Sequence, residues 1–162
     1  MPEGATLEPI RYASDVTFLT KSSGDTKAWP IYMTIGNILR RTRNKAAKHA
    51  IVLLELLPVL PKMLGVATRD AGQRQVNKEI ICDMMEAIFA PIVALENSGL
   101  EFKCANANVQ LSFPCLSAWI ADYFENVILH GLQQSQCAVC EVLPELLGSC
   151  LRHSAVKRDY RK

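Results

Sequence analysis

The chain opens with two strand-like segments separated by a polar turn, and this pattern most limits the folds available to it. The first segment, Ile10 to Thr20, reads IRYASDVTFLT, and the second, Trp29 to Ile38, reads WPIYMTIGNI. Both are rich in the aromatic and β-branched residues that strands favour. Between them, Lys21 to Lys27 contains Ser, Gly and Asp, which favour turns. The pattern predicts a strand, a hairpin loop and a second strand.

The middle of the chain adds a further apolar run and a helical pattern. Residues 50–60, AIVLLELLPVL, fit a buried strand or a buried helix by periodicity, and their length and Pro58 favour a strand. Over residues 76–95, apolar side chains recur mostly every three to four positions, which predicts an amphipathic helix. Pro91 should kink or end this helix near Ala90, because proline lacks the N–H that the helix requires.

The last part of the chain completes the expected domain. Residues 100–111 alternate at their ends around Asn106-Ala107-Asn108, which predicts a hairpin, and residues 113–121 form a strand or a helix. The order of elements predicts an α/β or α+β fold, a mixed sheet with a central helix and a C-terminal cysteine knuckle. We expect an N-terminal tail over 1–9, one domain over 10–140 and a basic C-terminal tail over 141–162.

Composition sets limits on the class of protein. With 162 residues, 49% hydrophobic and 21% charged, the chain fits one globular domain. Its net charge of +2 does not by itself indicate nucleic-acid binding. No apolar run reaches the roughly 18 to 20 residues of a membrane span, and the N-terminus lacks a secretory signal pattern. We therefore expect a soluble intracellular protein without membrane contact, whose six cysteines serve as thiols or metal ligands.

Asp15 is the first residue that suggests chemistry. It stands at the end of a strand-like segment, where a carboxylate can project from the edge of a sheet and bind a divalent metal ion. Metal-dependent phosphoryl transfer needs several such carboxylates close together. An isolated Asp more often begins a turn, and both interpretations stay open on this residue alone.

Two paired positions near the C-terminus resemble a zinc-binding pattern. Cys137-x₂-Cys140 is followed by Cys150-x₂-His153, and these donor types and spacings suit a tetrahedral Zn²⁺ site. Free thiols are the alternative. A redox role is disfavoured, because a redox pair of this spacing should open a helix after a strand.

A basic run lies between the second strand-like segment and the apolar run. Lys and Arg side chains release condensed counterions from phosphates, so this run suits contact with a DNA backbone. A solvated loop is the alternative reading. The candidate nucleic-acid-binding residues are Arg40, Arg41, Arg43, Lys45 and Lys48.

Three blocks of sequence resemble one family. Residues 13–38, ASDVTFLTKSSGDTKAWPIYMTIGNI, are similar to the start of the catalytic domain of Plavaka transposases, which belong to the Kyakuja-Dileera-Zisupton group of fungal DNA transposons. Residues 113–126, FPCLSAWIADYFEN, resemble that family's PILAAYIADYPEQ, and Cys137-x₂-Cys140 resembles its CPxC pair. The matched blocks run from about residue 10 to residue 140.

The resemblance implies an RNase H-like fold, at least in part, and a DNA partner. In that family, acidic residues hold Mg²⁺ or Mn²⁺ for strand cleavage and transfer at transposon ends. Carried over to this chain, Asp15 is the first-strand carboxylate and Asp122 is the second. The resemblance also implies a nuclear location.

Several departures from the family pattern lead us to expect an incomplete catalytic site. Where the family usually has an acidic CADG turn, this chain has Cys104-Ala105-Asn106-Ala107, so Asn106 stands at a usually acidic position. The family carries a further acidic ligand beyond the cysteine pair. We therefore expect a degenerate or truncated piece of a transposase catalytic domain, inactive alone. The alternative is a small non-enzymatic protein, derived from a transposon, that binds zinc or nucleic acid.

Overall fold

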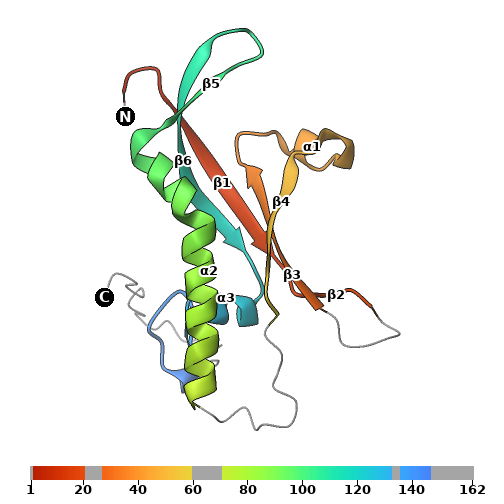
Figure 1. Ribbon diagram of the computed structural model, residues 1–162, viewed down its shortest axis with the longest axis vertical. Coiled ribbons are helices and arrows are strands. Elements are labelled where there is room, and N and C mark those ends of the chain that lie inside the picture. The colour runs from red at the N-terminus through yellow and green to blue at the C-terminus, as the bar shows by residue number, and fades with distance from the viewer. Residues whose placement is uncertain (1, 21–26, 60–70, 133–135, 147–162) are drawn as a thin grey trace.

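The computed structural model describes residues 2–20, 27–59, 71–132 and 136–146. These residues form a mixed α/β domain with a six-stranded sheet, and one long helix lies along one face of the sheet (Figure 1). The predicted α/β class is therefore confirmed. The RNase H-like fold and the cysteine knuckle stay predictions.

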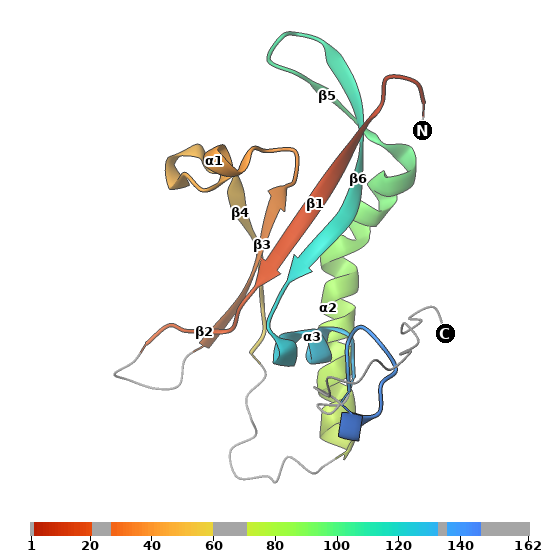
Figure 2. The same cartoon turned by 180° about the vertical axis from the view of Figure 1, so that it is seen from behind.

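The sheet is built around its first strand. The strands are β1 (Thr6–Ser14), β2 (Thr17–Phe18), β3 (Lys27–Ile35), β4 (Ile51–Leu57), β5 (Leu100–Lys103) and β6 (Val109–Ile120). β1 pairs with β3 in antiparallel fashion and with β6 in parallel fashion, while β2 and β4 pair with β3 and β5 pairs with β6. A parallel pair needs a crossover connection. The helix α2 (Ala71–Ser98) lies within that connection (Figure 2).

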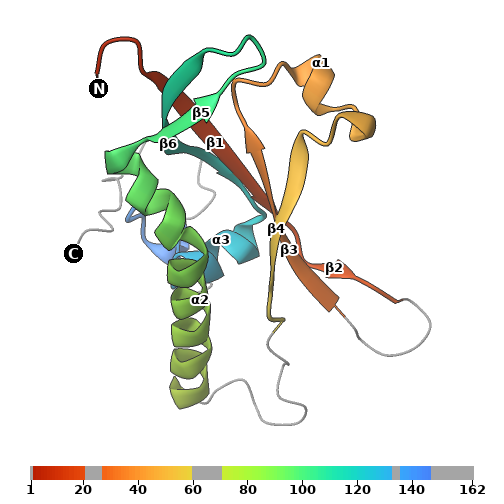
Figure 3. The same cartoon turned by 45° about the horizontal axis from the view of Figure 1, so that its top comes forward.

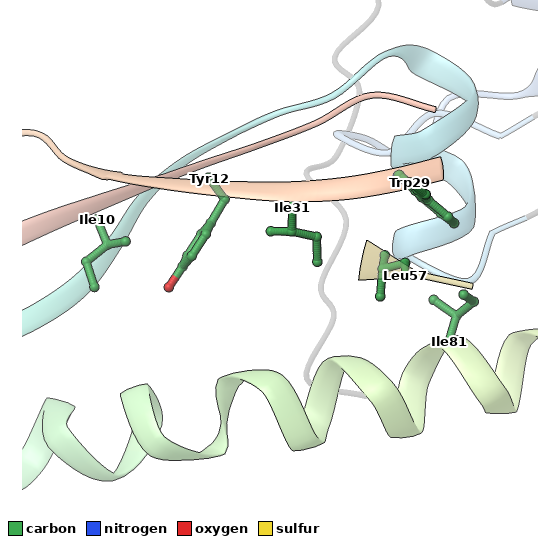
Figure 4. Packing of buried hydrophobic residues seen from close by; sticks show 6 residues of the cluster. All are labelled: Ile10, Tyr12, Trp29, Ile31, Leu57 and Ile81. Atoms are coloured by element: carbon green, nitrogen blue, oxygen red, sulfur yellow. The ribbon is translucent and has the colours of Figure 1, made fainter. Parts of the chain in front are cut away.

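The core lies between the sheet and α2, where the side chains of both elements meet (Figure 4). Alternate residues of a strand face the same side of a sheet, and the core-cluster residues of β1 and β3 follow that spacing. Ile31, at the centre, is 0% exposed. The six buried members are Ile10, Tyr12, Trp29, Ile31, Leu57 and Ile81.

The predicted strand over residues 50–60 is confirmed as β4, but the expectation that it is buried is wrong for most of its residues. Leu53 and Leu56 are 54% and 50% exposed. β4 pairs with β3, and Leu53 is in register with Tyr32, which is itself 41% exposed. A local apolar run shows strand propensity, but it does not show whether another layer covers the strand.

The predicted helix over residues 76–95 is also confirmed, and it extends further at both ends. The expected kink or end near Ala90 is not observed as an end, because α2 continues through Pro91 to Ser98. Proline removes one backbone hydrogen bond from a helix. The neighbouring Phe89 and Ile92 pack against the core, and this packing offsets that loss.

The end of α2 is set by Gly99 instead. Its φ of +71° lies in the left-handed region that glycine adopts readily, and its N–H donates to the Leu95 carbonyl at 2.8 Å. A Cβ on Gly99 would lie 2.8 Å from a Leu111 side-chain carbon, so the helix end is also packed tightly on β6.

The hairpin predicted over residues 100–111 is present as β5 and the start of β6. Its turn is closed by Cys104 N–H donating to the Asn108 carbonyl at 2.8 Å, and Asn106 Oδ1 accepts from Asn108 N–H at 3.1 Å. Ala107 takes a positive φ of +67° in this turn. For residues 113–121 a strand and a helix were both open; residues 113–120 belong to β6, which ends at Ile120.

The first strand begins earlier than the sequence predicted. β1 starts at Thr6, inside the range expected to be a tail, and ends at Ser14, with the short β2 following it. The turn expected over residues 21–27 lies mostly outside the described residues. In the described part of the chain, no helix has the length and apolar character needed to cross a membrane.

Candidate metal-binding end of the sheet

Asp15 and Asp122 follow two neighbouring strands at the same end of the sheet. Asp15 comes directly after β1, and Asp122 comes two residues after the end of β6. β1 and β6 are adjacent and parallel, with Ala13 in register with Ile120. The carboxyl ends of parallel neighbours meet at one edge of a sheet, so the fold brings both carboxylates there. Both residues are exposed.

The same end holds a buried carboxylate, that of Glu125, which is 3% exposed. Its Oε2 accepts from the Ser14 hydroxyl at 2.7 Å, and its Oε1 accepts from the Val16 N–H at 2.6 Å. These two donors flank Asp15 in the chain. The Glu125 carboxylate therefore accepts hydrogen bonds from both chain neighbours of Asp15, the first candidate ligand.

Asp122 has a second role as the N-cap of the short helix α3 (Tyr123–Leu129), which the sequence did not predict. Its Oδ1 accepts from the Glu125 N–H at 2.7 Å. The spacing Asp122-x-x-Glu125 is that of a capping box, in which the Glu usually reaches back to the N-cap N–H. Here the Glu125 side chain reaches β1 instead. The spacing was a signal for α3, but not for this long-range contact.

An aromatic layer supports this end from below. The Ser14 hydroxyl accepts from Trp119 Nε1 at 3.2 Å. Trp119 packs against Tyr12 and Phe89, with ring centroids 5.3 Å and 5.5 Å away. Trp29 is buried and Trp119 packs against the core, so both serve as core aromatic residues.

Tyr12 lies within this aromatic layer and is 2% exposed. Its hydroxyl has no hydrogen-bond partner among the described residues. Burial disfavours the charged phenolate and raises the pKa of Tyr12 to about 12. In Figure 4 the hydroxyl points from the sheet toward α2.

The basic run lies at the other end of the sheet. It forms the short helix α1 (Arg40–Arg43) and the 3₁₀ turn η1 (Ala46–Lys48), which link β3 to β4 (Figure 3). β3 is antiparallel to β1, with Ile35 in register with Ile10, so β3 ends beside the middle of β1. The candidate DNA contacts are therefore separated from Asp15 by about half the length of β1, from Ile10 to Ser14.

Most side chains of the basic run face solvent. Arg40, Arg41, Lys45 and Lys48 are exposed. Arg43 is partly buried, and its Nη1 has no hydrogen-bond partner among the described residues.

Asn106 lies far from both candidate carboxylates. It occupies the exposed turn before β6, whereas Asp122 follows the other end of this 12-residue strand. At about 3.3 Å per residue, the strand separates the two positions by roughly 40 Å. Asn106 stabilises the turn, because its Oδ1 accepts a hydrogen bond from the Asn108 N–H.

The first cysteine pair is partly described. Cys137 and Cys140 are both half-buried, and Val139 N–H donates to Cys137 Sγ at 3.3 Å. The Tyr123 hydroxyl donates to the Gln136 carbonyl at 3.1 Å, which places this segment beside the start of α3. Cys150 and His153 lie outside the described residues. Cys82, on α2, is exposed.

The described residues contain no group of three or more His, Cys, Asp or Glu side chains arranged to hold a metal ion. The two exposed carboxylates at the end of β1 and β6 therefore form a candidate site of two ligands. This restriction applies only to residues 2–20, 27–59, 71–132 and 136–146.

The fold and this site define an α/β domain that presents two carboxylates at the carboxyl ends of adjacent parallel strands. The model of the Plavaka transposase family matches residues 1–162, which is the whole chain. The chain belongs to the Plavaka transposase family, and the resemblance seen in its sequence is confirmed. Comparisons with curated proteins and with solved structures give no match.

Proposed function

We propose that the chain forms part of a transposase catalytic domain in which Asp15 and Asp122 hold Mg²⁺ or Mn²⁺. The observation that carries this proposal is the position of two exposed carboxylates after adjacent parallel strands. Carboxylate oxygens are the ligands that these hard cations prefer, so the residues present fit the metal. The central β1, parallel to β6, also supports an RNase H-like fold for this domain.

Bound Mg²⁺ would supply Lewis-acid stabilisation of the oxygens that attack and leave the DNA phosphate. In this proposal Asp15 and Asp122 bind the cation, and Asn106 takes no part. Two carboxylates are fewer than two-metal DNA cleavage requires. We therefore propose that this chain binds the cation but does not cleave DNA by itself.

The proposed partner is DNA, specifically transposon ends, and the proposed location is the nucleus. The family supports a DNA partner, and the exposed cations of α1 and η1 are suited to phosphates. The part of β3 that pairs with β1 runs from Ile31, opposite Ser14, to Ile35, so α1 lies roughly 15 to 20 Å or more from Asp15. A duplex of about six base pairs would cover that distance.

Isothermal titration calorimetry of the full chain with Mn²⁺ tests the metal site. We expect one site in the wild-type chain that is lost in Asp15→Asn and in Asp122→Asn, because asparagine keeps the shape and removes the charge. Asp83→Asn, at an exposed position on α2, is the matched control. Unchanged binding in both site variants would contradict the proposal.

A nicking assay on plasmid DNA with Mg²⁺ or Mn²⁺ tests the second part of the proposal. We expect no cleavage by the chain alone. Cleavage that disappears in Asp15→Ala would show a complete catalytic site and would overturn the claim of inactivity.

A second candidate function is zinc binding at Cys137 and Cys140, with Cys150 and His153 as the further ligands. The Val139 N–H directed at Cys137 Sγ favours it, because a hydrogen bond to sulfur stabilises the thiolate that zinc requires. Metal analysis of the purified protein tests this function. We expect one zinc per chain, lost in Cys137→Ser and retained in Cys82→Ser, and a folded metal-free protein would contradict it.

A further inference from the structure

We propose that Glu125 is a positioning residue that aligns Asp15 with Asp122, and that it is not itself a metal ligand. The proposal rests on the metal site described above. It concerns a residue that the resemblance did not assign to any role.

The carboxylate of Glu125 is buried, and both of its oxygens accept hydrogen bonds. A buried carboxylate must be hydrogen-bonded, because leaving its charge unsatisfied in the interior is costly. At 3% exposure, Glu125 meets this need with the Ser14 hydroxyl on Oε2 and the Val16 N–H on Oε1. Both oxygens are thus occupied by β1 and the residues after it. Bonds of this kind to a charged acceptor are the stronger class of protein hydrogen bond.

The two hydrogen bonds to the Glu125 carboxylate come from either side of Asp15. Ser14 and Val16 stand on either side of Asp15, so the backbone of Asp15 is held from both sides. The N–H of the same Glu125 donates to Asp122 Oδ1. A single residue therefore fixes the backbone that carries one ligand and restrains the carboxylate that is the other.

Holding Asp15 and Asp122 in place before the cation binds should increase the affinity for the cation. Asp15 and Asp122 are exposed, and exposed side chains lose conformational freedom when they bind a cation. A residue that fixes their positions beforehand reduces that loss. Partners that orient metal ligands typically change metal affinity by about 10-fold to 100-fold. We expect Glu125 to act at the lower end of this range, because it holds the Asp15 backbone and not the carboxylate.

The test compares Mn²⁺ affinity in the full-length wild-type chain, Asp15→Asn, Glu125→Gln and Ser14→Ala. Glutamine keeps the shape of Glu125 but removes its negative charge, so the Val16 N–H and the Ser14 hydroxyl lose a charged acceptor, and the NH₂ group can at best donate to Ser14 Oγ. Circular dichroism and thermal unfolding show whether each variant folds. Ser14→Ala removes one of the two bonds to Glu125, together with the bond from Trp119 Nε1, while Glu125 remains. It carries the test if Glu125→Gln does not fold.

We expect Asp15→Asn to abolish binding, and Glu125→Gln to raise the Kd for Mn²⁺ about tenfold at unchanged stoichiometry. Ser14→Ala should raise the Kd less. In the double variant Ser14→Ala/Glu125→Gln, the two effects on the Kd should be less than additive in free energy, because both changes act on the same contact.

An unchanged Kd in folded Glu125→Gln and Ser14→Ala would overturn the positioning role alone. Loss of the site in Glu125→Gln would make Glu125 a ligand and would also overturn it. Equal Mn²⁺ binding by the wild type and Asp15→Asn would overturn the metal site, and the positioning role with it.

Discussion

The two ends of the sheet hold their polar residues in different ways. At the acidic end, formed by residues 14–16 and 122–125, the hydrogen bonds of Glu125 join residues more than 100 positions apart in the chain. At the basic end, formed by residues 40–48, the backbone bonds are local, as between Arg43 N–H and the Leu39 carbonyl. The difference indicates that the acidic end is part of the folded core, whereas the basic end carries charge on a locally formed loop. Changes to the buried residues of the acidic end should therefore reduce stability, and changes at the basic end should alter DNA affinity with little effect on stability.

The largest effect should come from Glu125→Ala. This change leaves the Ser14 hydroxyl and the Val16 N–H without their acceptor, and we expect the free energy of unfolding to fall by about 3 kcal/mol. Arg41→Ala, the matched change at the basic end, should alter it by less than about 0.5 kcal/mol. Urea unfolding of both variants checks this, and equal losses would remove the distinction between the two ends.

The next effect concerns DNA affinity. Replacing Arg40, Arg41, Lys45 and Lys48 together with Gln should weaken binding to a short duplex about tenfold or more at low salt. The slope of log affinity against log salt should decrease in magnitude by up to roughly 3.6, since each of the four phosphate contacts contributes about 0.9. Fluorescence anisotropy at several salt concentrations measures both quantities. A single Lys103→Gln change on β5 is the control, and an unchanged slope in the quadruple variant would show that DNA binds elsewhere.

A smaller effect separates the two roles of Asp122. Asp122→Ala removes the N-cap of α3 and should lower the free energy of unfolding by about 1 kcal/mol. Asp122→Asn keeps a good capping side chain and should change it by only a few tenths of a kcal/mol. Thermal unfolding of the two variants tests the capping role. Equal stability of Ala and Asn at this position would mean that the observed bond to the Glu125 N–H contributes nothing.

The smallest effect concerns the aromatic layer beneath the acidic end. Tyr12→Phe removes a buried hydroxyl without a partner among the described residues, and we expect a gain of about 1 kcal/mol in the free energy of unfolding at neutral pH.

The same variant should show a distinct pH dependence. The pKa of Tyr12 is about 12 in the folded state and about 10 in the unfolded state, so the unfolded chain loses the proton first as pH rises. The wild type should therefore lose stability between pH 10 and 12 more steeply than Tyr12→Phe. Parallel curves for the two proteins in urea unfolding across this range would contradict the burial argument.

The sequence predicted the elements whose signals are local. Aromatic and β-branched runs located β3, the apolar spacing located α2, and the Asn residues located the turn before β6. Asp15 and Asp122 came from the family resemblance, and the structure shows them at one end of the sheet.

The sequence-based predictions that failed share one physical cause, which is packing between residues that are distant in the sequence. The local penalty of Pro91 is offset by the packing of Phe89 and Ile92. The exposure of Leu53 depends on which face α2 covers. Glu125 could be placed near Asp122 by its spacing, but its contacts with Ser14 and Val16 link distant parts of the chain.

The most direct test of the central claim is to locate Mn²⁺ on the full chain by paramagnetic broadening of backbone amide signals. We predict that substoichiometric Mn²⁺ broadens the amides of residues 14–16 and 122–125 most strongly, those of residues 40–48 much less and that of Asn106 least, and has no such effect in Asp15→Asn. Broadening centred on Cys137 and Cys140, or the same broadening at both ends of the sheet, would contradict a metal site at Asp15 and Asp122.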